Sequence, residues 1–452
     1  MSTRTQLSAI SLLMLACTFF SSVHPAYADD FFPYPIQSTQ LGNGLQVISV
    51  PFDSPGTVAF YIVVRVGSRD ELEQGKTGFA HFFEHMMFRG TTRFSPDQYT
   101  TIMQSCAGTF NASTSRDTTV FYTVANSACL EKLFDLESDR FRNLQYSEQV
   151  FKTEAQAVLG EYTKNFANPY MQLEEKTLSL AFKHHPYRHS VMGFLEDIKN
   201  MPNQYAYSRQ FFERFYRPNN ISLLVVGDVN PAQNLKLAKK YFGDWQRTGF
   251  RSLIPSDARQ VRELRDHIAF RGKNTIFKMV FKGPAYSDAN LDYVALSILL
   301  ELEFSDISPL HRKLVMDEKK VKHLFYGSPP TRDPFLITMG AELFDEKDMN
   351  SVQTAIEESL TKIRTQLITQ ADLDRVKSAF KYGRLNSLTT PLKLASTLGN
   401  YLALTGDPSS FKKMMLNIEK LKPEDLRQIA QKYLLSSTRT IVTLSPAKEN
   451  MP

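Results

Sequence analysis

The stretch His81-Phe82-Phe83-Glu84-His85 places two imidazoles and one carboxylate within five consecutive residues. On an α-helix, side chains four residues apart lie on the same face, so His81 and His85 can both reach one ion. Glu84 stands one position before the second histidine. This H-x-x-E-H order is the inverted zinc-peptidase order, in which two histidines bind the metal and the glutamate carries protons. The alternative is a pair of ordinary polar histidines on an apolar helix.

The chain has 452 residues, too many for one hydrophobic core and enough for two domains of about 200 residues. Residues 1–28 have the pattern of a cleaved secretory signal peptide. Arg4 gives a positive start, residues 10–20 are apolar, and Ala26-Tyr27-Ala28 is an A-x-A cleavage site. The apolar run is too short for a membrane-spanning helix. A lipoprotein anchor at Cys17 is the alternative, although the residues before it match a lipobox poorly.

Cleavage would leave Cys106 and Cys129, which form a disulfide only if their Cα atoms come close, and the spacing leaves this open. Without Arg4, 52 basic residues face 47 acidic ones, a mild positive charge for this size. No Lys/Arg block indicates nucleic-acid binding. After residue 28 no apolar stretch approaches 18 residues, so we expect a soluble mature protein without a transmembrane segment.

Strand and helix patterns alternate from about residue 36 to residue 246 and recur after a polar stretch at 246–263. The predicted strands are 45–50, 58–66, 118–125, 221–226, 267–270, 275–282, 335–342 and 438–444. Three predicted helices begin after Gly78, after Ser95 as N-cap and after Thr369 as N-cap. Further predicted helices cover 128–142, 151–165, 290–303, 350–367 and a segment from Pro423. We predict two similar α+β domains, at 36–246 and 263–448, joined by a linker at 247–262. The second domain has no H-x-x-E-H, so any metal belongs to the first.

A catalytic zinc needs a third protein ligand and an open position for water. The predicted helix 151–165 carries Glu154 and Glu161, which are two turns apart and therefore share one face. Val158 and Leu159 would pack this helix against its neighbour. Two carboxylates beside a core face are unusual unless something positive lies opposite. The alternative is a pair of solvated glutamates on an exposed helix.

The segment His81-Phe82-Phe83-Glu84-His85-Met86-Met87-Phe88-Arg89-Gly90-Thr91 resembles the zinc-site segment of the pitrilysin and mitochondrial-processing-peptidase family. Three other segments show the same resemblance: Asn111-Ala112-Ser113-Thr114 with Asp117, His185-Pro186-Tyr187 followed by Gly193, and Tyr216-Arg217-Pro218-Asn219-Asn220 leading to Val225-Val226-Gly227-Asp228. The resemblance is strong in the first half of the chain and extends to the second half in layout. It implies two homologous α/β-sandwich domains, each a mainly antiparallel sheet with packed helices.

The resemblance also implies the roles of the site residues. His81, His85 and Glu161 would bind one Zn²⁺ per chain, because Glu161 lies 76 residues after His85, close to the family's separation. Glu84 would be the general base that accepts a proton from water and returns it to the leaving amine. Glu154 matches the family's additional glutamate, which orients a ligand. The implied activity is that of a zinc-dependent endopeptidase acting on extended peptides or unfolded polypeptides.

Asn111, Ala112 and Thr114 stand in the stretch that resembles the family's substrate-binding edge strand. An extended peptide would add to such a strand through main-chain hydrogen bonds. The alternative is a turn and a strand with no role in binding.

The second half departs from the family pattern. Catalytically complete members carry an arginine and a tyrosine there, which hold the substrate over the metal. Pro309 stands where the arginine is expected, and Phe325, or alternatively Tyr326, stands at the tyrosine; Arg312 lies one helical turn on and could substitute. We therefore expect the zinc-bearing subunit of a periplasmic heterodimer whose homologous partner supplies the Arg/Tyr pair. The alternative is a non-catalytic peptide-binding or scaffold subunit.

Overall fold

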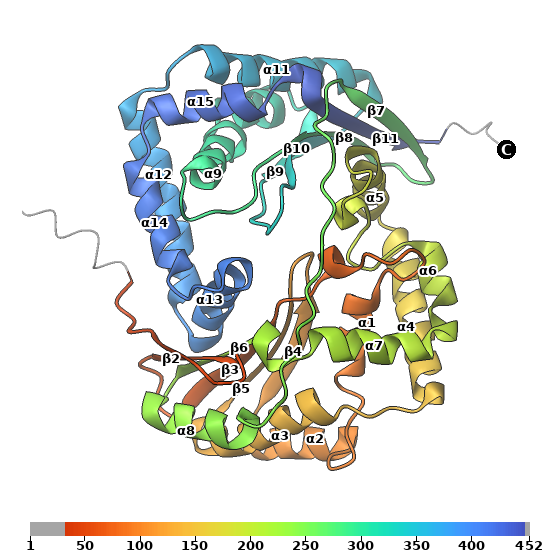
Figure 1. Ribbon diagram of the computed structural model, residues 1–452. Coiled ribbons are helices and arrows are strands. Elements are labelled where there is room, and N and C mark those ends of the chain that lie inside the picture. Colours follow the sequence, from red (N-terminus) through yellow and green to blue (C-terminus); the bar gives the residue numbers. More distant parts are fainter. Residues whose placement is uncertain (1–31, 448–452) are drawn as a thin grey trace, which may run out of the picture. The chain divides into compact units, whose positions relative to one another are not determined.

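Two β-sheets, one of six strands and one of five, dominate the computed structural model, which describes residues 32–447 (Figure 1). The first sheet has the order β1-β2-β6-β3-β5-β4, with β1 (Gln37–Gln40), β2 (Gln46–Pro51), β3 (Thr57–Val64), β4 (Thr109–Thr114), β5 (Thr119–Asn126) and β6 (Ile221–Gly227). The second has the order β7-β11-β8-β10-β9, with β7 (Leu264–Phe270), β8 (Thr275–Lys282), β9 (Val321–Gly327), β10 (Leu336–Leu343) and β11 (Arg439–Pro446). Within the described residues, the chain from Tyr34 onward forms one compact unit.

The two sheets share one topology apart from β1. Strands β2, β6, β3, β5 and β4 correspond in order to β7, β11, β8, β10 and β9. In each sheet one pair is parallel, β2 with β6 and β7 with β11, and the other pairs are antiparallel. The predicted pair of α+β domains with mainly antiparallel sheets is therefore confirmed.

The helices of the first half are α1 (Phe79–Met86), α2 (Pro96–Ser105), α3 (Leu130–Asn143), α4 (Glu148–Phe166), α5 (Pro169–Ala181), α6 (Leu195–Asn200), α7 (Tyr205–Phe215) and α8 (Pro231–Phe242). Those of the second half are α9 (Asp292–Phe304), α10 (Pro309–His311), α11 (Met349–Thr365), α12 (Gln370–Leu385), α13 (Pro391–Thr405), α14 (Ser410–Lys420) and α15 (Pro423–Tyr433). The Ser95 hydroxyl caps α2 by accepting the Gln98 N–H, and Thr369 caps α12 in the same way. Both N-caps agree with the prediction.

The two halves of the sequence exchange one helix each. Helix α5, from the first half, packs on β11 and β7 of the second sheet, whereas α13, from the second half, packs on β3 and β6 of the first (Figure 1). Strand β3 is consequently covered on both faces, and its residues from Val58 to Val64 are buried. This explains why β3 is a continuous apolar run rather than an alternating pattern.

Ion pairs also join the halves. The carboxylate of Asp333 accepts from the Arg69 guanidinium and lies 3.1 Å from His185 Nε2. Residues 243–263, between α8 and β7, contain no helix or strand. The domain boundaries at 246 and 263 stay a prediction.

The predicted signal peptide at 1–28 and the alternative anchor at Cys17 lie outside the described residues. None of the helices within residues 32–447 has the length and hydrophobicity that crossing a membrane requires.

Candidate metal centre

Helix α1 buries one face and presents the other to the candidate site. Its phenylalanines and Met86 are fully buried in the core of the first half, and Phe82 packs edge-to-face on Phe151 of α4 with ring centroids 5.0 Å apart. His81, Glu84 and His85 occupy the remaining face, because apolar residues take the positions that point into the core. Packing of α1 on α4 therefore determines where the two histidines point.

His81, His85 and Glu161 place their ligand atoms together. The distance from Glu161 Oε2 is 3.7 Å to His81 Nε2 and 3.4 Å to His85 Nε2, and one ligand atom from each residue lies within 4.8 Å of the other two. Two atoms each bound at about 2.0–2.1 Å to a tetrahedral zinc lie about 3.4 Å apart. Two of the three pairs lie near this separation, so the two imidazoles and the carboxylate would hold a zinc ion and would leave one position for water. Among the described residues, this is the one such group of His, Cys, Asp and Glu.

Both histidines have perturbed pKa values. Burial, with a smaller effect of the nearby His85, lowers the pKa of His81 to about 4, so that this imidazole is neutral near pH 7. A neutral imidazole is the form that binds metal ions. The hydrogen bond with Glu154 raises the pKa of His85.

Glu154 lies behind His85, where the sequence interpretation expects it. Its Oε1 atom is 2.9 Å from His85 Nδ1, and its Oε2 atom is paired with the guanidinium of Arg89. A carboxylate at Nδ1 keeps the proton on that nitrogen and leaves the Nε2 lone pair free to bind a metal. Arg89 was missed by sequence reasoning, since its contact depends on how α1 packs on α4.

Glu84 receives a hydrogen bond from the neighbouring strand. The Thr114 hydroxyl of β4 donates to Glu84 Oε2 at 2.7 Å. Burial raises the pKa of Glu84 above its usual value, and the bond from Thr114 opposes that rise. A half-buried carboxylate with a raised pKa, held beside a metal position, suits a group that accepts and returns a proton.

Strand β4 is an edge strand of the first sheet, as the resemblance implied. Side chains alternate along a strand, so Asn111 and Thr114 point to opposite faces. Asn111 and Ala112 line a cavity of about 520 Å³ together with Tyr122 and residues of α13. Of the three residues predicted to contact substrate, Thr114 is thus the one bonded to Glu84.

The second half has four positions considered for the family's substrate-holding arginine and tyrosine. The contacts described for them are with residues other than His81, Glu84, His85 and Glu161. Pro309 begins the short helix α10, and Arg312 is exposed and lies 3.8 Å from Asp317. Tyr326, on β9, donates its hydroxyl to Glu301 of α9 at 3.0 Å. Phe325 packs edge-to-face on Tyr170 of α5.

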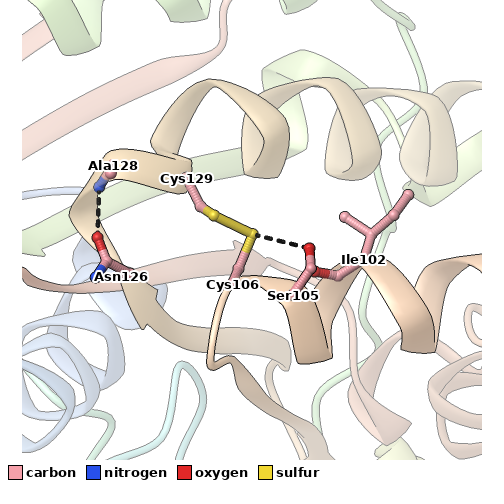
Figure 2. Close-up of a disulfide and its surroundings, with 6 residues drawn as sticks. All are labelled: Ile102, Ser105, Cys106, Asn126, Ala128 and Cys129. Carbon is pink, nitrogen blue, oxygen red and sulfur yellow. Dashed lines mark hydrogen bonds between the residues drawn. A yellow bond between two sulfur atoms is a disulfide. The ribbon is translucent and has the colours of Figure 1, made fainter.

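Cys106 and Cys129 are bonded, which answers the question that their spacing left open (Figure 2). Cys106 ends α2 and Cys129 precedes α3, so the bond closes a loop that contains both β4 and β5. It therefore ties together the two ends of the hairpin that carries the edge strand.

The fold has two α+β domains whose sheets share one topology, and an H-x-x-E-H helix faces a glutamate on a second helix. These features define the class of two-domain zinc-peptidase folds. The family model described as insulinase, peptidase family M16, matches residues 47–194, and the one described as the M16 inactive domain matches residues 204–380. The chain belongs to peptidase family M16.

Relatives extend this likeness over most of the chain. The zinc protease PqqE of Helicobacter pylori is 28% identical over 96% of this chain and 97% of that protein. The crystal structure of a protease from Helicobacter pylori superposes with a TM-score of 0.84 at 28% identity, covering 91% of this chain and 100% of that one. The mitochondrial-processing peptidase subunit beta of Neurospora crassa is 29% identical over 46% of this chain and 43% of that protein.

Proposed function

We propose that this chain is a zinc-dependent endopeptidase that hydrolyses extended peptides or unfolded polypeptides. The observation that carries the proposal is the approach of His81 Nε2 and His85 Nε2 to one carboxylate oxygen of Glu161, at 3.7 and 3.4 Å, with Glu84 on the same helix face. Membership of a family that contains zinc proteases supports it. A binding protein has no need of a half-buried carboxylate beside an open metal position.

His81, His85 and Glu161 are the proposed ligands, and Glu154 orients His85. When bound, zinc supplies a Lewis acid that allows water to act as a nucleophile near neutral pH. Glu84 accepts the proton of the attacking water and delivers it to the leaving amine. Thr114 keeps the Glu84 carboxylate pointed toward the site through its hydroxyl.

The proposed substrate position is the free edge of β4. An extended peptide paired with this edge gains main-chain hydrogen bonds that do not depend on sequence, which suits unfolded polypeptides. Its side chains would alternate between the Glu84 face and the opposite face, on which Asn111 lines the cavity. Such pairing leaves the scissile bond beside α1.

A homologous partner subunit is part of the proposal. Pro309 cannot supply the positive charge that the family's arginine brings, and Tyr326 is already bonded to Glu301. Without these groups, the charge that develops on the substrate carbonyl has no donor from the second half. A partner that carries the Arg/Tyr pair would complete the site, and export to the periplasm through residues 1–28 would place both chains together. The relative named as a subunit, the Neurospora crassa peptidase, supports this kind of assembly.

The test combines zinc content with turnover. The purified chain should bind about one zinc ion. Glu84→Gln should keep the zinc and, assayed together with the partner subunit, abolish chelator-sensitive cleavage of an unfolded protein such as reduced casein. Glu148→Gln, on the exposed face of α4, is the matched control and should retain both. Turnover that survives in Glu84→Gln would contradict the assigned proton carrier. Turnover by the isolated chain at the rate of an ordinary enzyme would contradict the need for a partner, and zinc binding without turnover in any assembly would favour a non-catalytic peptide-binding subunit.

A further inference from the structure

The beginning of α1 is held by a carboxylate from outside the helix. Glu71 is buried, and its two oxygens accept the backbone N–H groups of Gly78 and Ala80, each at 2.8 Å. The first N–H groups of a helix have no partner inside the helix, and Gly78 has no side chain to cap them. Glu71 therefore takes the place of an N-cap residue.

A second segment holds the residues just before α1. The Phe194 N–H donates to the Thr77 hydroxyl at 2.8 Å, and that hydroxyl donates to Asp197 at 2.7 Å. Gly78 and Gly193 both adopt left-handed backbone conformations, and a Cβ on Gly193 would lie 2.7 Å from the Gly78 nitrogen. This close approach gives a physical reason for the Gly193 that follows His185-Pro186-Tyr187, which the proposed reaction does not use.

These contacts act close to the metal ligands. Helix α1 has eight residues, so its first turn sets the direction of the whole helix. Ala80, whose N–H is bound by Glu71, directly precedes His81. A shift of this turn would move His81 relative to Glu161, which is fixed on a different helix.

We propose that Glu71 is a positioning residue for the metal centre: by binding the first turn of α1, it sets His81 at ligand distance from His85 and Glu161. The inference rests on the proposed zinc site. Burial raises the pKa of Glu71 to about 8, and the two N–H donors partly oppose that rise. The positioning role depends only on both carboxyl oxygens accepting hydrogen bonds. A glutamine at this position has one acceptor oxygen and would turn its NH₂ group toward the second N–H.

The control residue lies two positions further on. Glu73 is partly exposed and pairs with Lys76 and Arg214, away from the backbone of α1. Glu73→Gln therefore makes the same chemical change in the same segment without touching the helix. Thr77→Val removes the hydroxyl between Phe194 and Asp197 and provides a second variant if Glu71→Gln does not fold.

The experiment measures the zinc dissociation constant by competition with a chromophoric chelator and the visible absorption of the cobalt-substituted protein, which reports ligand geometry. Glu71→Gln should weaken zinc binding by about 10- to 100-fold and change the cobalt spectrum. Glu73→Gln should match the wild type in both. Thr77→Val should weaken zinc binding in the same direction as Glu71→Gln.

Two results overturn the inference alone: zinc affinity and a cobalt spectrum unchanged in Glu71→Gln, or an equal loss in Glu73→Gln. If Glu71→Gln does not fold, unchanged zinc binding in Thr77→Val overturns it. A wild-type chain that binds no zinc overturns the proposed function as well. The two failures are distinguishable, because the first requires a wild type that binds the metal.

Discussion

The Nδ1 atom of His85 lies 2.9 Å from Glu154, whose other carboxylate oxygen is paired with Arg89. Glu154 is thus held from both sides, by an imidazole and a guanidinium. These two contacts hold the Glu154 carboxylate in place, although Glu154 is not one of the candidate metal ligands. Glu154 in turn orients the His85 ring.

Replacing Glu154 by glutamine should weaken zinc binding by about 10- to 100-fold, because the amide can no longer accept from both His85 and Arg89. Competition with a chromophoric chelator gives the dissociation constant. Glu148→Gln is the control, since Glu148 lies on the exposed face of the same helix and pairs with Lys152. Equal zinc affinities in the wild type and Glu154→Gln would contradict the role assigned to Glu154.

Zinc should stabilise the folded chain. A metal present at about 1,000 times its dissociation constant adds about 4 kcal/mol to the free energy of unfolding if it binds only the folded state. Denaturant unfolding with zinc and with a chelator measures the difference. His85→Ala should unfold with nearly the same free energy in both conditions; a zinc effect of full size in that variant would place the metal elsewhere.

Thr114 should matter through its hydroxyl. A hydrogen bond to a charged group contributes about 1.5–3 kcal/mol, so Thr114→Val should lower kcat by about 10- to 100-fold if Glu84 must be held in place. Thr114→Ser keeps the hydroxyl and should retain most of the activity. Steady-state kinetics of the two variants, assayed in the active assembly, decide the point. Equal rates for valine and serine would show that the bond to Glu84 is not needed.

Much of the fold could be predicted from the sequence, because local patterns determine it. Strand β3 is rich in β-branched and aromatic residues, and Ser95 and Thr369 are helix caps with the acceptors that a helix start requires. The assignment of Glu161 as the third ligand comes from the family resemblance. Spacing alone predicts that His81 and His85, four positions apart, share one helix face, and that Glu154 and Glu161, two turns apart, share another. These features depend on neighbours in the chain.

The remaining features depend on tertiary packing. Helix α13 contains Gly399 inside a helical run, which weakens a helix prediction, and in the structure that glycine faces the ring of Tyr61 on β3. No local pattern indicates that a helix of the second half covers the first sheet. The contact between Thr114 and Glu84 joins residues 30 positions apart, and that between Glu71 and Ala80 reaches around the turn before α1. Each of these contacts can be predicted only when the packing of the helices and strands is known.

Asp333 should contribute stability that disappears in acid. Although burial raises the pKa of this carboxyl, its bonds with His185 and Arg69 lower it well below the usual range. A folded-state pKa below that of the unfolded chain stabilises the fold above pH 3.8, and this contribution is lost as the pH falls below that value. Asp333→Asn should therefore cost about 3 kcal/mol at pH 7 and progressively less below pH 4. Urea unfolding at several pH values tests this, and a cost that stays constant down to pH 2 would contradict it.

The disulfide should stabilise the hairpin that carries the edge strand. Closing a loop between cysteines 23 positions apart restricts the unfolded chain and contributes about 3 kcal/mol. The double variant Cys106→Ser, Cys129→Ser should unfold at lower denaturant concentration than the oxidised wild type and should match the reduced wild type. If reduction leaves the unfolding midpoint unchanged, the bond contributes no stability in solution.

The most direct test of the central claim is the position of zinc in crystals of the zinc-loaded protein, located by anomalous scattering at the zinc absorption edge. One strong peak is expected about 2.0–2.2 Å from His81 Nε2, His85 Nε2 and a carboxylate oxygen of Glu161. A peak at other residues, or no peak between α1 and α4 in protein that has been loaded with zinc, would contradict it.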